Sequence, residues 1–320
     1  MNCYLFDHKV RLFLIFILLA SFMLFVSGCS KKDKDVIVQE ESLDIEEKGN
    51  ELPTLTLGHV PSDNVVRLFQ RLEPLTEYLG NELKMNIEPG SATDYSGIIE
   101  RMKMGDFDIV MLGPLSYVEG HDKAGYEAIL KPIRFGKPSY KSIIITRKNS
   151  GINKLEDLVG KTFAFTDEKS TSGYIYPKAL LLKHKLIPGK NLRVFFAGEH
   201  DNVVLNVLRG EYDAGACYDD ARVTALKNDK SKIDQLVIIA ATDDIPYDPI
   251  AASPKLIKEN PELVRKIKEA FIGLNTKTAG PQILKQLTGN IDGYIEASDS
   301  EYDVVREMNK FLKTEKNPAK

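Results

Sequence analysis

The chain has 320 residues, of which 43% are hydrophobic and 28% charged. This is the composition of an ordinary globular protein, with room for one large domain or for two lobes that each have a core. The formal net charge of −3 and the lack of any basic cluster exclude a protein that binds nucleic acid through a basic surface.

The first 28 residues have the pattern of a secretory signal peptide. Lys9 and Arg11 precede an apolar run over residues 12–26, and small residues follow it. Val26-Ser27-Gly28-Cys29 resembles a bacterial lipobox, which predicts cleavage before Cys29 and a lipid on that cysteine. An uncleaved membrane helix is the alternative, but about fifteen apolar residues are short for a bilayer span.

The remaining cysteine and the following charged stretch complete this processing pattern. Once the signal is removed and Cys29 is lipidated, only Cys217 is left, so no internal disulfide is predicted. Cys217 ends an apolar strand pattern, which predicts that it is buried rather than reactive. Residues 29–52 are charged and have no sustained apolar period, which predicts a flexible tether.

From residue 53 onward, strand patterns alternate with helix patterns. The predicted strands cover residues 55–60, 85–88, 107–112, 128–133, 142–147, 162–166, 192–197, 212–216, 236–241 and 250–252. The predicted helices include residues 65–79, 95–104, 179–182, 201–209, 219–227, 263–274 and 301–312. This alternation favours an α/β fold in which mainly parallel sheets are covered by helices on both faces.

Polar residues recur where a predicted strand gives way to a helix. Ser170-Thr171-Ser172 follows the strand at 162–166, while Tyr95 and His200 stand at two other helix starts. A helix start presents unpaired backbone N–H groups, so the hydroxyl residues can seat an oxyanion or simply cap the helix. Because ligands bind at the carboxyl edge of open α/β sheets, convergence of these junctions predicts a site for a small anion.

The sequence gives little support to other chemistries. The histidines after the signal lack the spacing of a zinc site with Cys, Asp or Glu, and no cofactor-binding motif is present. Ser170, His200 and Asp248 allow a hydrolase triad by order alone, but no further feature supports one.

Several motifs, taken in chain order, resemble those of a known family. They are Asp94-Tyr95-x-Gly97, Gly113-Pro114-Leu115-Ser116-Tyr117, Ser170-Thr171-Ser172-Gly173-Tyr174-x-x-Pro177, Gly198-x-His200-Asp201, Gly210-Glu-x-Asp213 and Ile245-Pro246-x-Asp248-Pro249. Across residues 53–275 the chain resembles the phosphonate, phosphite and phosphate substrate-binding proteins of ABC importers.

The resemblance implies a periplasmic-binding-protein type II fold. Two α/β lobes, each with a mainly parallel sheet, would be joined by two hinge strands and would close on the ligand. The first lobe is expected at residues 53–139 plus 247–314 and the second at 140–246, with a tail at 315–320. The crossovers would lie near Tyr140 and Pro246.

The resemblance also assigns the walls of a binding site. Ser170, Thr171 and Ser172 match the oxyanion seat, and Tyr95 and Tyr140 match ligand-contacting tyrosines of opposite lobes. The structural alternative for these two tyrosines is packing.

Three further residues match polar positions of the family site. His200 matches a histidine that faces the phosphonate oxygens, and Asp248 an aspartate that accepts a hydrogen bond from a protonated ligand oxygen. Asp220 falls where an aminoalkylphosphonate binder has a glutamate for the ammonium group, and Asp219 is an equal candidate. His200 as a helix cap and Asp248 as a turn residue are the structural alternatives.

The expected protein is a lipid-anchored, monomeric receptor on the extracytoplasmic face of the cell membrane. It would capture a phosphorus oxyanion and deliver it to the permease and ATPase subunits of an ABC importer, without a cofactor and without enzymatic activity. A ligand-sensing module that feeds a sensor kinase is the alternative, and an enzyme on the same fold is a further one.

Overall fold

The computed structural model describes residues 52–61, 64–287 and 291–316. These residues belong to one compact unit. The predicted signal peptide, the lipidation site at Cys29 and the tether up to residue 51 lie outside the described residues. No helix in the described ranges is long and apolar enough to cross a membrane.

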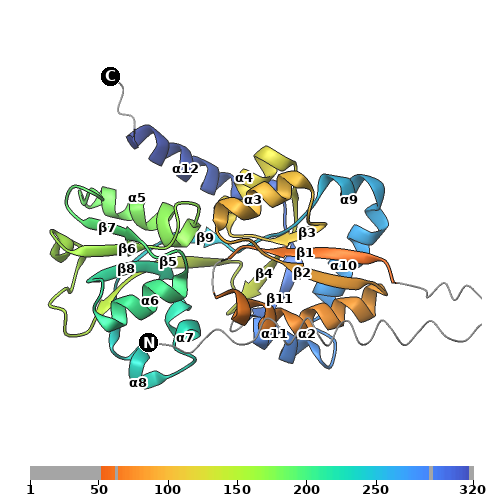
Figure 1. Ribbon diagram of the computed structural model, residues 1–320, viewed down its shortest axis with the longest axis horizontal. Coiled ribbons are helices and arrows are strands. Elements are labelled where there is room, and N and C mark those ends of the chain that lie inside the picture. Colours follow the sequence, from red (N-terminus) through yellow and green to blue (C-terminus); the bar gives the residue numbers. More distant parts are fainter. Residues whose placement is uncertain (1–51, 62–63, 288–290, 317–320) are drawn as a thin grey trace, which may run out of the picture. The chain divides into compact units, whose positions relative to one another are not determined.

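One sheet has six strands in the order β11-β4-β10-β3-β1-β2 (Figure 1). Its strands are β1 (Thr54–His59), β2 (Asn86–Gly90), β3 (Ile109–Met111), β4 (Glu127–Arg134), β10 (Ile250–Ala252) and β11 (Ile291–Glu296). Its helices are α2 (Val65–Leu83), α3 (Tyr95–Met104), α4 (Pro114–Ala124), α9 (Pro254–Glu259), α10 (Pro261–Gly273) and α11 (Gly280–Leu287). We call this sheet and its helices the first lobe.

The other sheet has five strands in the order β7-β6-β8-β5-β9. Its strands are β5 (Ser139–Arg147), β6 (Thr162–Phe165), β7 (Arg193–Phe196), β8 (Ala214–Tyr218) and β9 (Leu236–Pro246). Its helical segments are η1 (Leu155–Leu158), η2 (Thr171–Ile175), α5 (Tyr176–Lys183), α6 (His200–Arg209), α7 (Ala221–Ala225) and α8 (Lys230–Ile233). We call this group the second lobe.

The predicted α/β fold with two sheets flanked by helices is confirmed, and both sheets contain parallel and antiparallel pairs. β1 pairs in parallel with β2 and β3, and β6 with β7 and β8. By contrast, β10 is antiparallel to β3 and β4, β11 is antiparallel to β4, and β5 is antiparallel to β8 and β9. The physical reason is the crossover: β4 and β9 leave their sheets at the carboxyl edge. The strands that receive the chain, β5 and β10, enter at the same edge and must run the opposite way.

The parallel part of each sheet is fastened by the same contact. In the first lobe, Asp108 Oδ2 accepts hydrogen bonds from Thr56 N at 2.8 Å and from Thr56 Oγ1 at 2.9 Å. In the second lobe, Asp213 Oδ2 accepts from Thr162 N and Oγ1, both at 2.8 Å. In both lobes the aspartate N–H donates back to the threonine hydroxyl at 2.8 Å. A charged acceptor thus joins two neighbouring strands at the end remote from their carboxyl edge.

Over most of the described residues the element order follows the sequence prediction, and the differences include the end of β9 and the segment after α10. β9 continues to Pro246, five residues beyond the predicted end, because Asp244, Ile245 and Pro246 still pair with β5 after a register shift. α11 and β11 were not predicted, since α11 is short and β11 contains Asp292 and Gly293, which break a strand pattern.

The last helix, α12 (Asp303–Lys316), follows the short turn η3 (Asp299–Tyr302). It packs against α4 of the first lobe and also contacts η2 and α5 of the second lobe (Figure 1). Val305 and Leu312 are buried in the same apolar cluster as Ile175 and Ala179. α12 therefore bridges the two lobes.

Candidate ligand-binding site

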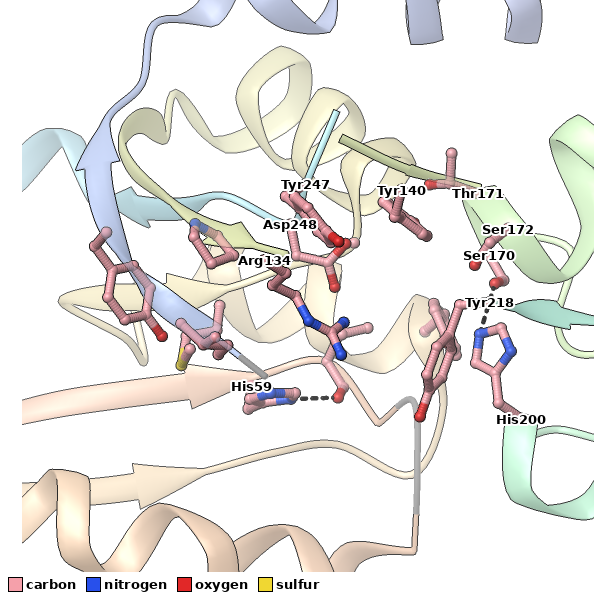
Figure 2. A pocket seen from close by; sticks show the side chains of 17 residues that line it. His59, Arg134, Tyr140, Ser170, Thr171, Ser172, His200, Tyr218, Tyr247 and Asp248 are labelled. Carbon is pink, nitrogen blue, oxygen red and sulfur yellow. Dashed lines mark hydrogen bonds between the residues drawn. The ribbon is translucent and has the colours of Figure 1, made fainter. Parts of the chain in front are cut away.

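A cavity of about 100 Å³ is lined by residues of both lobes (Figure 2). Among its walls are seven of the eight ligand-binding residues predicted from the sequence: Tyr95, Tyr140, Ser170, Thr171, Ser172, His200 and Asp248. They come from segments separated by as many as 150 residues but meet at the carboxyl edges of the two sheets, as open α/β folds predict. The cavity is several times larger than the space one water molecule needs, so a small ligand fits.

The hydroxyl loop, Ser170-Thr171-Ser172, serves as a helix cap and as a cavity wall. Ser170 Oγ accepts a hydrogen bond from Gly173 N at 3.0 Å, and Thr171 Oγ1 accepts one from Leu115 N of the first lobe at 2.8 Å. The loop enters a π-helical turn, a conformation that often occurs at functional sites. All three hydroxyl residues are buried. The loop therefore caps the helix and lines the cavity in the same conformation.

His200 is the first residue of α6 and is buried against the hydroxyl loop. Its Nε2 lies 3.4 Å from Ser170 Oγ, and its Nδ1 lies 3.3 Å from Thr166 Oγ1 (Figure 2). The Nδ1 contact goes to a hydroxyl, where a hydrolase triad would place a carboxylate. His200 therefore contacts the hydroxyl loop through a ring nitrogen.

Two of the tyrosines that line the cavity, Tyr140 and Tyr247, lie near the crossovers. Tyr140 on β5 stacks on Tyr247, with ring centroids 5.2 Å apart and planes inclined by 15°. Burial, reinforced by the nearby charge of Asp248, raises the pKa of Tyr140 well above its usual value. Tyr95 is the first residue of α3, whose N-terminus is capped by Asp94. Tyr140 therefore keeps its proton and can act as a hydrogen-bond donor.

Asp248 follows β9 and lines the cavity beside Tyr247. Figure 2 shows its carboxylate directed toward the interior, across from the hydroxyl loop. The cavity thus combines hydroxyl donors on one side with an anionic acceptor on another.

Asp220 does not line the cavity. Its Oδ2 lies 2.7 Å from Nη2 of Arg134, and Arg134 itself is one of the lining residues. Asp219 does not line the cavity either: it accepts a hydrogen bond from Lys141 N at 3.4 Å. Burial, and then the neighbouring Asp220, raises the pKa of Asp219. The structure therefore places an arginine where the sequence predicted a free carboxylate.

Sequence reasoning also missed other lining residues, among them His59, Arg134, Tyr218, Tyr247 and Tyr294. A signal for two of them was present. His59 and Arg134 are the last residues of β1 and β4, and the carboxyl ends of parallel strands face the ligand edge. The same rule that selected the hydroxyl loop would have selected them.

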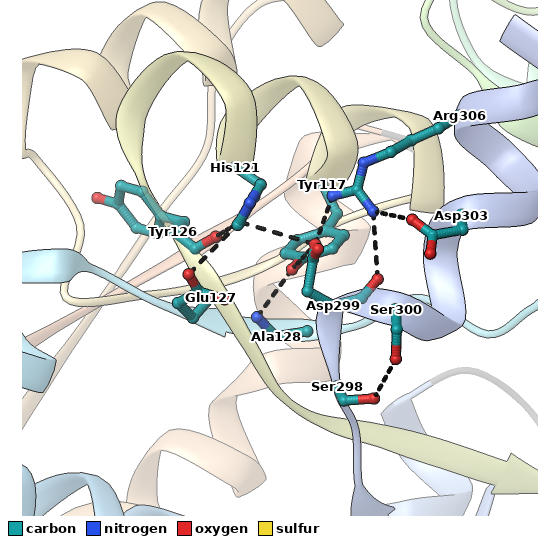
Figure 3. A network of polar contacts seen from close by, with 10 residues as sticks. All are labelled: Tyr117, His121, Tyr126, Glu127, Ala128, Ser298, Asp299, Ser300, Asp303 and Arg306. Atoms are coloured by element: carbon teal, nitrogen blue, oxygen red, sulfur yellow. Dashed lines mark hydrogen bonds and ion pairs between the residues drawn. The ribbon is translucent and has the colours of Figure 1, made fainter.

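Away from the cavity, a second polar cluster surrounds Asp299 (Figure 3). Asp299 Oδ1 accepts a hydrogen bond from Tyr117 at 2.7 Å and pairs with Arg306 on α12. His121 Nδ1 lies 3.7 Å from the same carboxylate. None of these residues lines the cavity, and no group of His, Cys, Asp or Glu in the described ranges has the arrangement of a metal site. The cluster fastens α12 to α4.

The buried cysteine is as predicted. Cys217 lies fully buried on β8, and burial raises the pKa of its thiol to about 12. It is therefore protonated and unreactive at neutral pH.

Residues 57–302 match a family described as the periplasmic substrate-binding protein of the phosphonate ABC transporter. This chain belongs to that family. Its members are the substrate-binding components of importers, which agrees with the resemblance seen in the sequence.

Individual relatives agree in fold and length. The chain is 28% identical to the phosphate-import protein PhnD of Mycolicibacterium smegmatis, over 89% of this chain and 91% of that protein. It is 26% identical to the phosphonates-binding periplasmic protein of Escherichia coli, over 73% of this chain and 70% of that protein. The solved structure of PhnD1 from Prochlorococcus marinus, in complex with methylphosphonate, superposes with a TM-score of 0.74 at 22% identity. That alignment covers 81% of this chain and 98% of the other, and confirms the periplasmic-binding-protein type II fold.

Proposed function

We propose that this protein captures a phosphorus oxyanion in the cavity between its lobes and delivers it to an ABC importer. The observation that carries the proposal is the hydroxyl loop with His200 beside it, facing Asp248 across one small cavity. The loop offers hydroxyl and backbone donors at a helix start, which is where proteins bind phosphate-like groups. The names of the relatives support the same ligand class.

Asp248 narrows the choice of anion. A carboxylate beside a fully ionised anion in a water-poor cavity is repelled by several kcal/mol, because two like unit charges about 4 Å apart repel each other by ~4 kcal/mol. The repulsion becomes a hydrogen bond if the ligand carries a proton. Monoprotonated phosphate, phosphite and phosphonates carry one at neutral pH, and sulfate does not. Asp248 therefore acts as a proton acceptor that excludes sulfate.

The same proposal assigns contacts to the other walls. Ser170, Thr171, Ser172 and His200 hold the oxyanion, with Tyr95 and Tyr140 closing on it from opposite lobes. Binding draws the lobes together by bending at the two crossovers, residues 134–139 and 246–250. The lobes are proposed at residues 53–139 plus 247–314 and 140–246.

The same proposal covers the cellular location of the protein and its partners. A lipid on Cys29 anchors the chain to the extracytoplasmic face of the membrane, and residues 29–52 hold the lobes away from the bilayer. The partners are the permease and ATPase subunits of the importer. The protein works as a monomer and releases its ligand unchanged, without enzymatic turnover.

Calorimetry of the full-length protein in detergent tests the proposal. We expect binding of phosphate, phosphite or methylphosphonate, and an affinity for sulfate at least about 100-fold lower, the factor that ~2.7 kcal/mol of repulsion produces. Asp248→Asn should weaken phosphite binding and reduce the preference over sulfate. Asp234→Asn, at an exposed site outside the cavity, is the matched control. Sulfate that binds as tightly as phosphite would contradict the role of Asp248.

A further inference from the structure

The cavity contains a buried cation that the sequence did not predict. Arg134 is the last residue of β4 and lines the cavity, with only 8% of its side chain exposed. Figure 2 shows its guanidinium group inside the cavity, entering from the side opposite Ser170 and Ser172. An arginine stays charged at any pH a protein survives, so the cavity holds a permanent positive charge.

Two contacts fix this guanidinium. Nη2 of Arg134 lies 2.7 Å from Oδ2 of Asp220, and the guanidinium carbon lies 5.6 Å from the ring centroid of Tyr247. The backbone is also held: Arg134 and Lys137 exchange hydrogen bonds of 3.0 and 2.9 Å across a tight two-residue turn. The side chain is thus positioned by the second lobe from one direction and by the crossover from another.

The ion pair with Arg134 determines whether Asp220 can bind an ammonium group of a ligand. A carboxylate at the rim of an oxyanion site would attract a ligand's ammonium group, as the sequence led us to expect. Here the carboxylate faces Arg134, and the group that lines the cavity is the guanidinium. A ligand therefore meets a cation where an amine-binding site presents an anion.

We propose that Arg134, positioned by Asp220, sets the charge selectivity of the cavity, which accepts phosphorus oxyanions without a cationic substituent and rejects aminoalkylphosphonates. This inference rests on the proposed function and specifies its ligand class. With the oxyanion on the hydroxyl loop, the fourth substituent of phosphorus projects away from that loop, toward the wall from which Arg134 enters. An ammonium group there lies close to a like charge in a water-poor site, where repulsion is weakly screened.

A matched pair of ligands isolates this charge. Propylphosphonate and 2-aminoethylphosphonate have nearly the same size and differ by a methyl in place of the ammonium group. Calorimetry of the full-length protein should show propylphosphonate binding at least about tenfold more tightly, a difference of ~1.4 kcal/mol. Equal affinities, or tighter binding of the amine, would overturn the inference.

Substitution of the arginine provides the second arm. Arg134→Gln removes the cation and leaves the Asp220 carboxylate able to attract an ammonium, so the preference for propylphosphonate should fall by at least about tenfold. Lys131→Gln is the control, because Lys131 is a buried cation of the same strand that pairs with Glu301 and does not line the cavity. A preference that Arg134→Gln leaves unchanged would overturn the inference.

A further variant covers the case in which Arg134→Gln does not fold, which its melting curve would reveal. Asp220→Asn keeps the cation but removes its balancing charge, so rejection of the amine should strengthen by at least about threefold. A preference that stays the same or falls in Asp220→Asn contradicts the inference. If the wild-type protein binds neither these ligands nor phosphate, phosphite and methylphosphonate, the proposed function fails instead.

Discussion

At the scale of single residues, Gly173 shows how tightly the proposed oxyanion seat is packed. A Cβ at this position would lie 2.2 Å from Thr166 Oγ1 and 2.8 Å from Ser170 Oγ, the two hydroxyls that contact His200. Both distances are shorter than the contacts that Cβ atoms make in folded proteins. The glycine therefore lets three polar groups of the seat come together.

Gly173→Ala should consequently damage the site. We expect a loss of stability of about 1–3 kcal/mol, typical of overpacking a buried position, and at least a tenfold weaker affinity for methylphosphonate. Thermal melting and calorimetry measure the two effects. Gly273→Ala is the control, since a Cβ there meets only Tyr78 at 3.7 Å, and it should change neither quantity much. An unchanged affinity in Gly173→Ala would show that the seat does not depend on this packing.

The sequence predicted the hydroxyl residues and the histidine that line the cavity, but not its arginine. Ser170 and His200 stand at helix starts, where a local pattern reveals the unpaired N–H groups that attract an anion. The end of β4 marks Arg134 as a residue of the ligand edge, but its pairing with Asp220, which is 86 residues away, has no signal in the sequence. Pairing of charges across lobes depends on the tertiary fold and cannot be read from spacing along the chain.

At the scale of elements, the threonine–aspartate contacts hold the parallel strands of each lobe. Burial alone would raise the pKa of Asp213, but hydrogen bonds from the backbone and side chain of Thr162 outweigh it and lower this pKa. A carboxyl whose pKa is lower in the folded chain stabilises the fold above its unfolded pKa of ~3.9. That contribution disappears as the pH falls through the lower, folded value.

Asp213→Asn should therefore be destabilised in a pH-dependent way. At pH 7 we expect a loss of about 1–2 kcal/mol, since the amide keeps an acceptor but loses the charge that strengthens both bonds. The loss should shrink as the pH falls below the unfolded pKa of ~3.9 and through the lower folded pKa, where the wild-type carboxyl also becomes neutral. Urea unfolding at several pH values measures it, with Asp234→Asn as an exposed control. A loss that is constant from pH 7 to acid would mean that packing, rather than charge, is responsible.

Elements were predicted from the sequence where their signal is local. Periodicity and caps located α2 and α3, both of which begin after a side-chain cap. Strand direction could not be obtained in this way, because it depends on where the chain crosses between lobes. β5 and β10 are antiparallel additions for that reason alone.

At the scale of the molecule, several polar contacts join the two lobes. Arg67 of α2 pairs with Asp201 of α6, whose side chain is only 3% exposed. Lys169 Nζ lies 2.5 Å from Glu119 Oε1 of α4, and Leu115 N donates to Thr171 Oγ1 at 2.8 Å. These bonds join the two lobes in the described arrangement.

Removing one of these bonds should weaken ligand binding without touching the cavity. Arg67→Ala takes away a cation that faces a buried carboxylate, and an affinity loss of about 5- to 30-fold is expected, as for coupling energies of ~1–2 kcal/mol. Calorimetry with methylphosphonate measures the loss, and small-angle scattering should show a larger radius of gyration in the absence of ligand. Arg265→Ala, which breaks exposed pairs within α10, is the control. Equal affinity in Arg67→Ala and wild type would rule out this contribution to closure.

The position of α12 has a thermodynamic consequence for the whole cycle. Because this helix packs on α4 and also contacts η2 and α5, separation of the lobes exposes apolar surface that the described arrangement buries. Closure on a ligand then buries that surface again, and burial of apolar surface lowers the heat capacity. We therefore expect the enthalpy of capture to become more favourable as the temperature rises, even though the contacts proposed for the anion are polar.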